Sequence, residues 1–433
     1  MKLPPTPMEK APDPELGTAP IPVERYTSVD FMQPEWDGMW LRVWLMAGRE
    51  SDIPEPGDYF TFDVGRESVL VVRQRDGNIV ARHNVCMHRG NRLCASGRGH
   101  VRRFLCRFHG WAYDIDGSLA HVTDRECFPQ GLPEEKLHLA ELRCDTWGGF
   151  VFVSFDPDAE PLHDFLGVIP RHLDPYHMEE CSILNDITLE IDCNWKTCVD
   201  AFNEAYHVQA THPGLMQYSD DVNVQIDCYD RHTRFLYPLA VVSPRLANHG
   251  EITEPIRELF LRGAGIDPDE FEGSAADVRS AIAKSMRTVM GPAMGVDFSE
   301  LNDDQLIDDY HYTIFPNITF NIHARGVWVF RHRPHPSDPN KMYFDIINML
   351  RAPGSRIERP PHEQHRAGEY ALAKAMGGGD VLDEDVANLP GIQAGMNSRC
   401  YEGLFLGTQE LRIRHWHSVL DRYLTKPDPG SEA

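Results

Sequence analysis

The sequence predicts an α+β fold in two parts: an N-terminal domain made of strands alone, and a larger domain in which an antiparallel sheet is flanked by helices. Three observations support this prediction. β-Rich runs in the first third of the chain are joined by Asp-Gly pairs, the strongest short signal for a hairpin. Later strands are grouped and followed by helices, which is typical of α+β domains. The 433 residues also suffice for two or three domains of about 100 to 200 residues each.

An N-terminal arm is expected at residues 1–39, the all-β domain at 40–158 and the second domain at 159–433. Eight prolines lie among the first 34 residues, without the apolar run of a signal peptide, and therefore indicate an arm. The all-β domain should contain two hairpins and end in an apolar strand before Asp156 and Pro157. These elements are expected at 69–75 with 78–84, at 113–115 with 118–122, and at 149–155.

The second domain should combine one sheet with several helices, judged from the spacing of its apolar residues. Its polar segment 243–309 is interpreted as an insertion that covers a pocket. The expected helices are 162–176, 195–210, 275–290 and 409–424, and the expected strands are 183–191, 310–322, 326–333 and 341–351.

Two short motifs in the all-β domain each supply one cysteine and one histidine. They run from Cys86 to His88 and from Cys106 to His109, with seventeen residues between them, and a glycine follows each histidine. Two thiolates and two imidazoles in this order suit a [2Fe–2S] cluster in which the cysteines hold one iron and the histidines the other, a Rieske centre. A Cys2His2 zinc site would use the same ligand types, but zinc fingers usually place both cysteines in one half. The cluster is therefore the preferred interpretation.

A second group of metal-ligand residues follows about a hundred residues later. Glu204 and His207 are three residues apart and would share a face of the expected helix. Pro213 disfavours the helical conformation for His212, so the helix should end there and His212 can turn toward His207. Two histidines with one carboxylate leave open positions on an Fe(II) ion, the arrangement of Fe(II) oxygenases.

With these motifs the chain resembles the α-subunits of Rieske non-heme iron oxygenases, the aromatic ring-hydroxylating oxygenases, from about residue 40 to the C-terminal helix. The resemblance implies a [2Fe–2S] cluster and a mononuclear Fe(II) that uses O2 to hydroxylate or dihydroxylate an aromatic substrate. It also implies electrons from NAD(P)H through a separate reductase, with or without a ferredoxin, and a homotrimer (α3) or an α3β3 assembly. A monooxygenase or demethylase acting on a quaternary ammonium or N- or O-methyl substrate is the alternative.

The resemblance places the third iron ligand in an acidic cluster on a late helix. Asp385 matches best, because apolar residues continue from it at helical spacing, and Asp383 is its competitor. Glu204 stands where the family usually has an aspartate that bridges to a cluster histidine of the next subunit, here His109. Asp200 stands where asparagine is common. Glu204 and Asp200 are therefore the candidate catalytic residues, and glutamate at the bridging position occurs in relatives that oxidise quaternary ammonium compounds.

The sequence identifies the residues of the substrate pocket less clearly than those of the metal sites. The candidate lining residues, of which several could equally be plain core, are Phe202, Val208, Phe315, Asn317, Phe320 and Trp328. No arginine or lysine is recognisable as a carboxylate clamp.

The composition restricts the partners. A net charge of −24 disfavours nucleic acid and anionic membranes. The longest apolar stretch, 147–155, is too short for a membrane span, so a cytoplasmic protein is expected. Two other classes are conceivable: a Rieske electron carrier without oxygenation, and a binding module with an empty second site. Either would leave the long second domain or its histidine pair unexplained.

Overall fold

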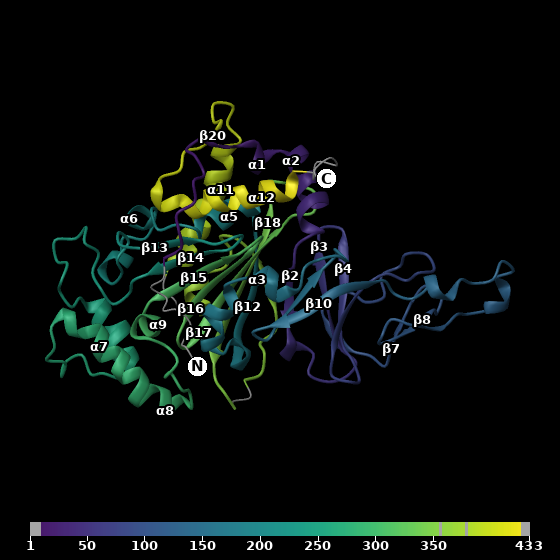
Figure 1. Ribbon diagram of the computed structural model, residues 1–433, viewed down its shortest axis with the longest axis horizontal. Helices are drawn as coiled ribbons and strands as arrows, with labels where there is room; N and C mark the ends of the chain where they lie inside the picture. The colour runs from purple at the N-terminus through teal and green to yellow at the C-terminus, as the bar shows by residue number, and fades with distance from the viewer. Residues whose placement is uncertain (1–9, 355–356, 377–379, 426–433) are drawn as a thin grey trace. The chain divides into compact units, whose positions relative to one another are not determined.

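The computed structural model describes residues 10–354, 357–376 and 380–425, which divide into two compact units (Figure 1). One unit is formed by residues 34–167. The other combines the segment before residue 34 with the chain from residue 168 onward. The first nine residues of the predicted arm lie outside the described residues, and the described part of the arm up to residue 33 belongs to the second unit.

The first unit is built from two antiparallel sheets. The larger has the strand order β2-β11-β10-β5-β4-β3-β6, and the smaller has the order β7-β8-β9. The strands are β2 (Leu45–Arg49), β3 (Asp58–Val64), β4 (Glu67–Arg73), β5 (Ile79–His83), β6 (Arg98–His100), β7 (Arg103–Leu105), β8 (Ala112–Asp114), β9 (Leu119–His121), β10 (Glu141–Trp147) and β11 (Phe150–Ser154). Both predicted hairpins are present, as β4 with β5 and β8 with β9.

The second unit contains an eight-stranded sheet with the order β13-β14-β15-β16-β17-β18-β12-β19, in which only the edge pair β12–β19 is parallel. A two-stranded pair, β1 (Ile21–Pro22) with β20 (Gly403–Leu404), ties the N-terminal segment to the C-terminal region. The strands of the large sheet are β12 (Cys181–Ile191), β13 (Gln225–Cys228), β14 (Thr233–Tyr237), β15 (Asp309–Ile314), β16 (Ile318–His323), β17 (Gly326–Pro334), β18 (Met342–Arg351) and β19 (Glu363–Arg366).

Helices complete the α+β fold, which confirms the predicted class. In Figure 1 the helices α5, α11 and α12 lie together beside the large sheet, and both α5 and α12 contact its strands. The α-helices are α1 (Glu24–Thr27), α2 (Val29–Pro34), α3 (Leu162–Leu166), α4 (Ile169–Leu173), α5 (Trp195–Ala201), α6 (Val208–Thr211), α7 (Ala275–Ser285), α8 (Gly291–Met294), α9 (Asp303–Ile307), α10 (Leu372–Met376), α11 (Val381–Met396) and α12 (Leu411–Leu424).

Three predicted elements are wrong in their continuity. The helix expected at 162–176 is α3 and α4, separated by Gly167, whose φ of +56° ends α3, and by Val168. The strand expected at 310–322 is two strands, β15 and β16, joined by a turn that contains Pro316, whose ring cannot donate to a strand ladder. The helix expected at 195–210 is α5 and α6, separated by residues 202–207. All three errors arise because apolar spacing alone does not report where the backbone turns.

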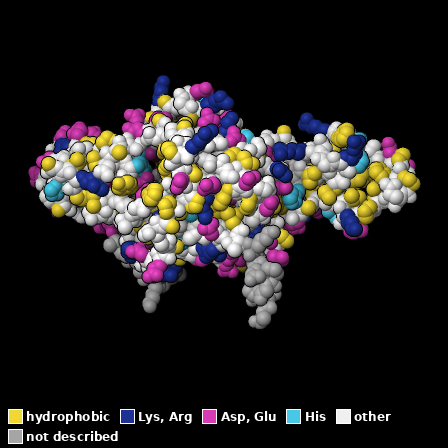
Figure 2. Space-filling model, turned by 90° about the horizontal axis from the view of Figure 1, so that it is seen from above, with side chains coloured by type: hydrophobic (Ala, Val, Ile, Leu, Met, Phe, Trp, Pro, Cys, Tyr) yellow, Lys and Arg dark blue, Asp and Glu magenta, His cyan; other side chains and the backbone are white. Residues whose placement is uncertain are grey.

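Charged side chains are interspersed over the face shown in Figure 2. Across the described residues no helix combines the length and the apolar character that crossing a membrane requires.

Candidate active site

The two cysteine-histidine motifs form a matched pair of loops in the first unit. Cys86 follows β5 and Cys106 follows β7. In each loop the glycine amide donates to the cysteine carbonyl four residues earlier, Gly90 to Cys86 at 2.9 Å and Gly110 to Cys106 at 3.0 Å. Both glycines have positive φ, +76° and +75°, the region that L-residues with a Cβ rarely adopt. The same backbone geometry therefore presents each cysteine-histidine pair.

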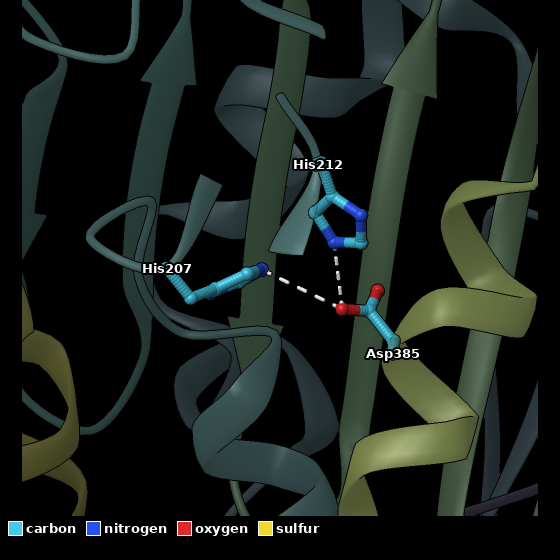
Figure 3. A group of neighbouring side chains, drawn as sticks. All are labelled: His207, His212 and Asp385. Atoms are coloured by element: carbon cyan, nitrogen blue, oxygen red, sulfur yellow. Dashed lines mark hydrogen bonds and ion pairs between the residues drawn. The ribbon is translucent and has the colours of Figure 1, made fainter. Parts of the chain in front are cut away.

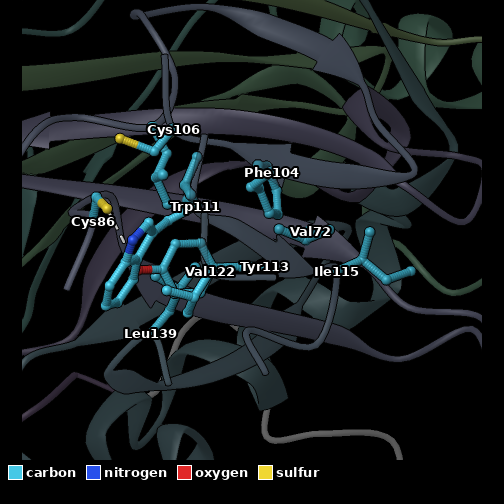
Figure 4. Close-up of a cluster of buried hydrophobic side chains, with 11 residues drawn as sticks. Val72, Cys86, Phe104, Cys106, Trp111, Tyr113, Ile115, Val122 and Leu139 are labelled. Atoms are coloured by element: carbon cyan, nitrogen blue, oxygen red, sulfur yellow. Dashed lines mark hydrogen bonds between the residues drawn. The ribbon is translucent and has the colours of Figure 1, made fainter. Parts of the chain in front are cut away.

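The side chains of the two loops converge. The rings of His88 and His109 lie 4.7 Å apart between centroids, and His88 stacks on Trp111 at the same distance. Burial and the neighbouring His109 lower the pKa of His88, which keeps its imidazole neutral, the state a metal ligand needs. Figure 4 shows Cys86 and Cys106 beside Trp111 and Tyr113 at one end of the buried core.

A second set of side chains comes together in the other unit. His212 Nε2 lies 2.8 Å and His207 Nε2 3.5 Å from Oδ1 of Asp385, and one ligand atom from each residue lies within 4.8 Å of the others (Figure 3). His207 directly precedes α6, His212 directly follows it, and Asp385 lies in α11. The predicted end of the helix before Pro213 is observed, and it lets both rings face the same point.

A further carboxylate contacts Nδ1 of each of the two histidine rings. Glu204 Oε1 lies 2.6 Å from Nδ1 of His207, and Glu384 Oε2 lies 2.6 Å from Nδ1 of His212. Burial alone would lower the pKa of either histidine, but Glu204, Glu384 and Asp385 outweigh it and hold both pKa values above the usual value. This concentration of negative charge around two imidazoles favours a bound cation, and the outer carboxylates fix each ring so that Nε2 faces inward.

The structure separates Asp385 from its predicted competitor. The carboxylate of Asp383 accepts hydrogen bonds from the backbone amides of Leu372 at 2.9 Å and Ala373 at 2.8 Å, and so caps the start of α10. Asp385 is 7% exposed and faces the histidines. Residues 383 and 385 differ by about 200° around a helix, so only one of them can point at the histidines.

A cavity of about 310 Å³ borders this triad. Its floor is one face of the large sheet, where side chains two residues apart point the same way. The remaining walls come from the segment 201–218, which includes the irregular stretch between α5 and α6, from Leu239, and from α10 and α11. The floor residues are Phe235, Tyr237, Asp309, His311, Asn321, His323, Trp328 and Phe330. Of the predicted insertion 243–309, only its last residue contributes, so the expectation that this segment covers the pocket is not met within the described residues.

Half of the predicted pocket residues line the cavity, and the other half do not. Phe202, Val208 and Trp328 line the cavity. Phe315, Asn317 and Phe320 are absent from the lining among the described residues, and their prediction is corrected accordingly. Phe320 is on the opposite face of β16 from Asn321, because a strand alternates its side chains. Phe315 and Asn317 lie in the turn before β16, where Phe315 packs on Trp416 and Asn317 donates to His332.

Glu204 lies between this cavity and a second one. The second cavity, about 350 Å³, is also lined by His207, Asp385 and Asp200. Asp200 is held by Tyr26, whose hydroxyl donates to Oδ2 at 2.5 Å and lies 2.6 Å from Nε2 of His417. The sequence had no signal for Tyr26, because its contact with Asp200 spans 174 positions.

Comparisons with known protein families agree with this architecture. A family model described as "Ring hydroxylating alpha subunit (catalytic domain)" matches residues 178–426, more than half of the chain. A model of the "Rieske [2Fe-2S] domain" matches residues 43–135. The chain therefore belongs to the α-subunits of the Rieske-type ring-hydroxylating oxygenases.

The individual relatives include subunits of an aromatic dioxygenase and of monooxygenases that are named for quaternary ammonium compounds. The chain is 38% identical over 333 residues, 73% of its own length and 68% of the relative, to the chlorobenzene dioxygenase subunit alpha of Cupriavidus sp. (strain PS12). It is 30% identical over 197 residues to the glycine betaine monooxygenase oxygenase subunit of Pseudomonas aeruginosa, covering 46% of each chain. It is 32% identical over 216 residues to the carnitine monooxygenase oxygenase subunit of Escherichia coli (strain K12), covering 48% of this chain and 55% of that protein. The matches thus span about half the length of the betaine and carnitine proteins.

Solved structures share the fold across almost the whole chain. A quaternary ammonium Rieske monooxygenase in complex with L-carnitine gives a TM-score of 0.68 at 19% identity, covering 96% of this chain and 100% of that one. Naphthalene 1,2-dioxygenase with indole bound gives a TM-score of 0.65 at 18% identity, covering 95% of this chain and 94% of that one. At these identities the likeness concerns the fold.

The donor sets fit the two groups that the family carries, a [2Fe–2S] cluster and a mononuclear iron. Nδ1 of His88 and Nδ1 of His109 are buried and lack a hydrogen-bond partner within the described chain, as expected of nitrogens that bind metal. In the other unit, two imidazoles and one carboxylate converge on one point, a donor set suited to Fe(II).

Proposed function

We propose that this protein is the terminal oxygenase component of a multi-component system, and that it hydroxylates or dihydroxylates an aromatic substrate with O2. The observation that carries the proposal is the convergence of His207, His212 and Asp385 at the edge of a cavity walled by aromatic side chains. Cys86, His88, Cys106 and His109 would hold the [2Fe–2S] cluster. Electrons would come from NAD(P)H through a separate reductase, with or without a ferredoxin, and a cytoplasmic location fits that supply.

The residues around the triad have distinct roles in this proposal. His207, His212 and Asp385 would hold Fe(II), which when bound supplies the site for O2 activation. Glu204 orients His207 through Nδ1, and Glu384 orients His212, so that both Nε2 atoms face Asp385. Val208, Phe202 and the other apolar and aromatic side chains of the lining exclude water and hold the substrate beside the triad.

Glu204 is also proposed to connect the two metal centres of a trimer, either α3 or α3β3. It contacts His207 on one side and lines the second cavity on the other. A carboxylate there can accept a hydrogen bond from His109 of the partner subunit and shorten the electron path. Asp200, held by Tyr26, lies in the same cavity and would support Glu204.

A monooxygenase or demethylase acting on a quaternary ammonium substrate is the second candidate. Glutamate rather than aspartate at the bridging position favours it, as do the betaine and carnitine relatives. A Rieske electron carrier would not need the triad or the cavity.

Iron counting with matched variants tests the proposal. Wild-type protein prepared anaerobically should hold about three irons per chain, two of them in a Rieske cluster with its characteristic electron paramagnetic resonance signal. Asp385→Ala should lose one iron and all oxygenation while the cluster signal stays intact. Asp383→Ala, the matched control from the same helix, should keep all three irons. Retention of three irons by Asp385→Ala, or a zinc-only wild-type protein, would refute the assignment.

A further inference from the structure

The floor of the active-site cavity carries a row of four side chains, one from each of four neighbouring strands. The strand register places Phe235 opposite His311, His311 opposite Asn321, and Asn321 opposite Trp328. All four line the cavity, and adjacent strands lie about 4.8 Å apart. The row therefore presents two polar groups side by side, with an aromatic ring at each end.

His311 lines the cavity and carries a single buried N–H group. Its Nδ1 lies 2.9 Å from Nη2 of Arg412, and because a guanidinium has only donors, Nδ1 accepts this hydrogen bond. Burial and the charge of Arg412 hold the pKa of His311 well below its usual value, so the ring is neutral and its one proton is on Nε2. The side chain is 4% exposed, and Nε2 has no hydrogen-bond partner among the described residues.

Two further polar groups lie next to this N–H. Nδ2 of Asn321 is buried and lacks a partner within the described parts of the chain. Asp309 is two residues before His311 on the same face of β15, and its Oδ1 accepts no hydrogen bond there but lies 3.9 Å from Nε2 of His323. Burial raises the pKa of Asp309 to about 8 despite the opposing effect of Arg412, so at neutral pH this carboxyl is mostly protonated and can donate.

Arg412 stands directly behind the row as a fully buried cation. Its hydrogen bonds go to Thr233, His311 and Thr313, all neutral groups, and no carboxylate of the described residues lies within ion-pair distance. Burial lowers the pKa of Arg412 to about 9, which still leaves it charged at neutral pH. Carboxyl groups at longer range, those of Asp309, Asp227 and Glu204, partly offset the effect of burial, and an anion that binds nearby would stabilise this cation further.

We propose that this row binds a carboxylate group of the substrate, with His311 and Asn321 as hydrogen-bond donors and Arg412 as a positioning residue that acts through His311. The inference rests on the proposed function, because it names the substrate class of the same cavity. The aromatic rings of Phe235 and Trp328 contact the remainder of the ligand. The carboxylate end is held at the sheet, and the carbon to be oxidised faces the triad on the helical wall.

Binding without turnover tests this inference. Iron-loaded wild-type protein is titrated calorimetrically, without reductant or O2, with pairs that differ in the carboxylate: benzoate and benzamide, phenylacetate and phenylacetamide, betaine and choline. In at least one pair the carboxylate member should bind about tenfold more tightly, as hydrogen bonds to a charged group allow. If no carboxylate binds better than its partner, including the case in which none binds, the inference is refuted.

Variants connect any such preference to the row. Asn321→Asp replaces a donor with an acceptor and should remove the preference for the acid. Arg412→Gln should weaken the binding of the acid while leaving the affinity for the amide unchanged. A structural defect would not produce such a selective loss. Asn223→Asp is the matched control, since Asn223 is an exposed turn residue bonded to Asp220, and its preference should equal that of the wild type. An unchanged preference in Asn321→Asp would overturn the assignment.

The two proposals fail in distinguishable ways. A protein that prefers carboxylates but contains no mononuclear iron and consumes no O2 would refute the proposed function and leave the binding row intact. A protein that oxygenates neutral or cationic compounds and ignores carboxylates would refute the row and leave the proposed function intact.

Discussion

Alanine substitution of the two loop glycines gives a matched test of how the cluster loops are held. Gly90 and Gly110 have nearly the same φ, so a Cβ imposes the same left-handed strain on both, about 1–2 kcal/mol. The Cβ at position 90 meets no atom within 4 Å, whereas at position 110 it lies 2.9 Å from Oγ1 of Thr123. That hydroxyl donates to the carbonyl of His109 at 2.7 Å, and displacing it costs a further ~1 kcal/mol.

The expected difference of ~1 kcal/mol between the two variants corresponds to a roughly fivefold larger population of opened loop. Cluster loss from the opened loop can be followed as bleaching of the visible absorption at a fixed, low denaturant concentration. Gly90→Ala should bleach faster than wild type, and Gly110→Ala about fivefold faster still.

A double-mutant cycle provides the control. In a Thr123→Ala background the contact is gone, so Gly110→Ala should cost no more than Gly90→Ala. Equal bleaching of the two single variants, or faster bleaching of Gly90→Ala, would show that Thr123 does not support the loop and would refute the reasoning.

Three further outcomes are expected. Glu204→Gln should keep both metal centres and normal cluster reduction, but cluster reoxidation by O2 with substrate should become very slow; stopped-flow traces at the wild-type rate would show another electron route. Because the pKa of Asp309 is raised to about 8, its protonated form persists up to that pH, and ionisation above it should repel a bound carboxylate. Affinity for an aromatic acid should therefore be steady from pH 6 to 7 and fall as the pH passes 8, whereas Asp309→Asn should show a flat profile over that range. Brief chelation should remove the mononuclear iron and oxygen uptake while the cluster absorption remains, and rebinding of Fe(II) should fail in His207→Ala.

Local spacing was sufficient for much of this protein. The two hairpins, the matched cysteine-histidine loops and the end of α6 at His212 all depend on residues within a few positions of one another. Turn residues and proline act on the adjacent backbone, so a sequence displays their effect directly. The proximity of His207 and Glu204 was also anticipated, although it is achieved in an irregular segment rather than along a continuous helix.

Other features depend on residues far apart in the chain. Spacing left Asp383 and Asp385 as competitors, and only the position of α10 shows that Asp383 caps that helix. The sequence predicts Phe320 as a pocket residue. The register of β16 instead places the side chain of Asn321 in the cavity lining and that of Phe320 on the opposite face of the strand.

Arg412 gives the clearest contrast between sequence and tertiary structure. In the sequence it is one arginine in an amphipathic helix, with nothing to relate it to a pocket. Packing of α12 beside β14 and β15 brings it to His311, 101 positions away, and there its donors determine which nitrogen of that ring carries the proton. The sequence by itself determined the local loops and the ligand types that each contributes. Tertiary structure decided which of these groups meet and in what protonation state, because burial, strand register and long-range hydrogen bonds arise only when distant segments pack together.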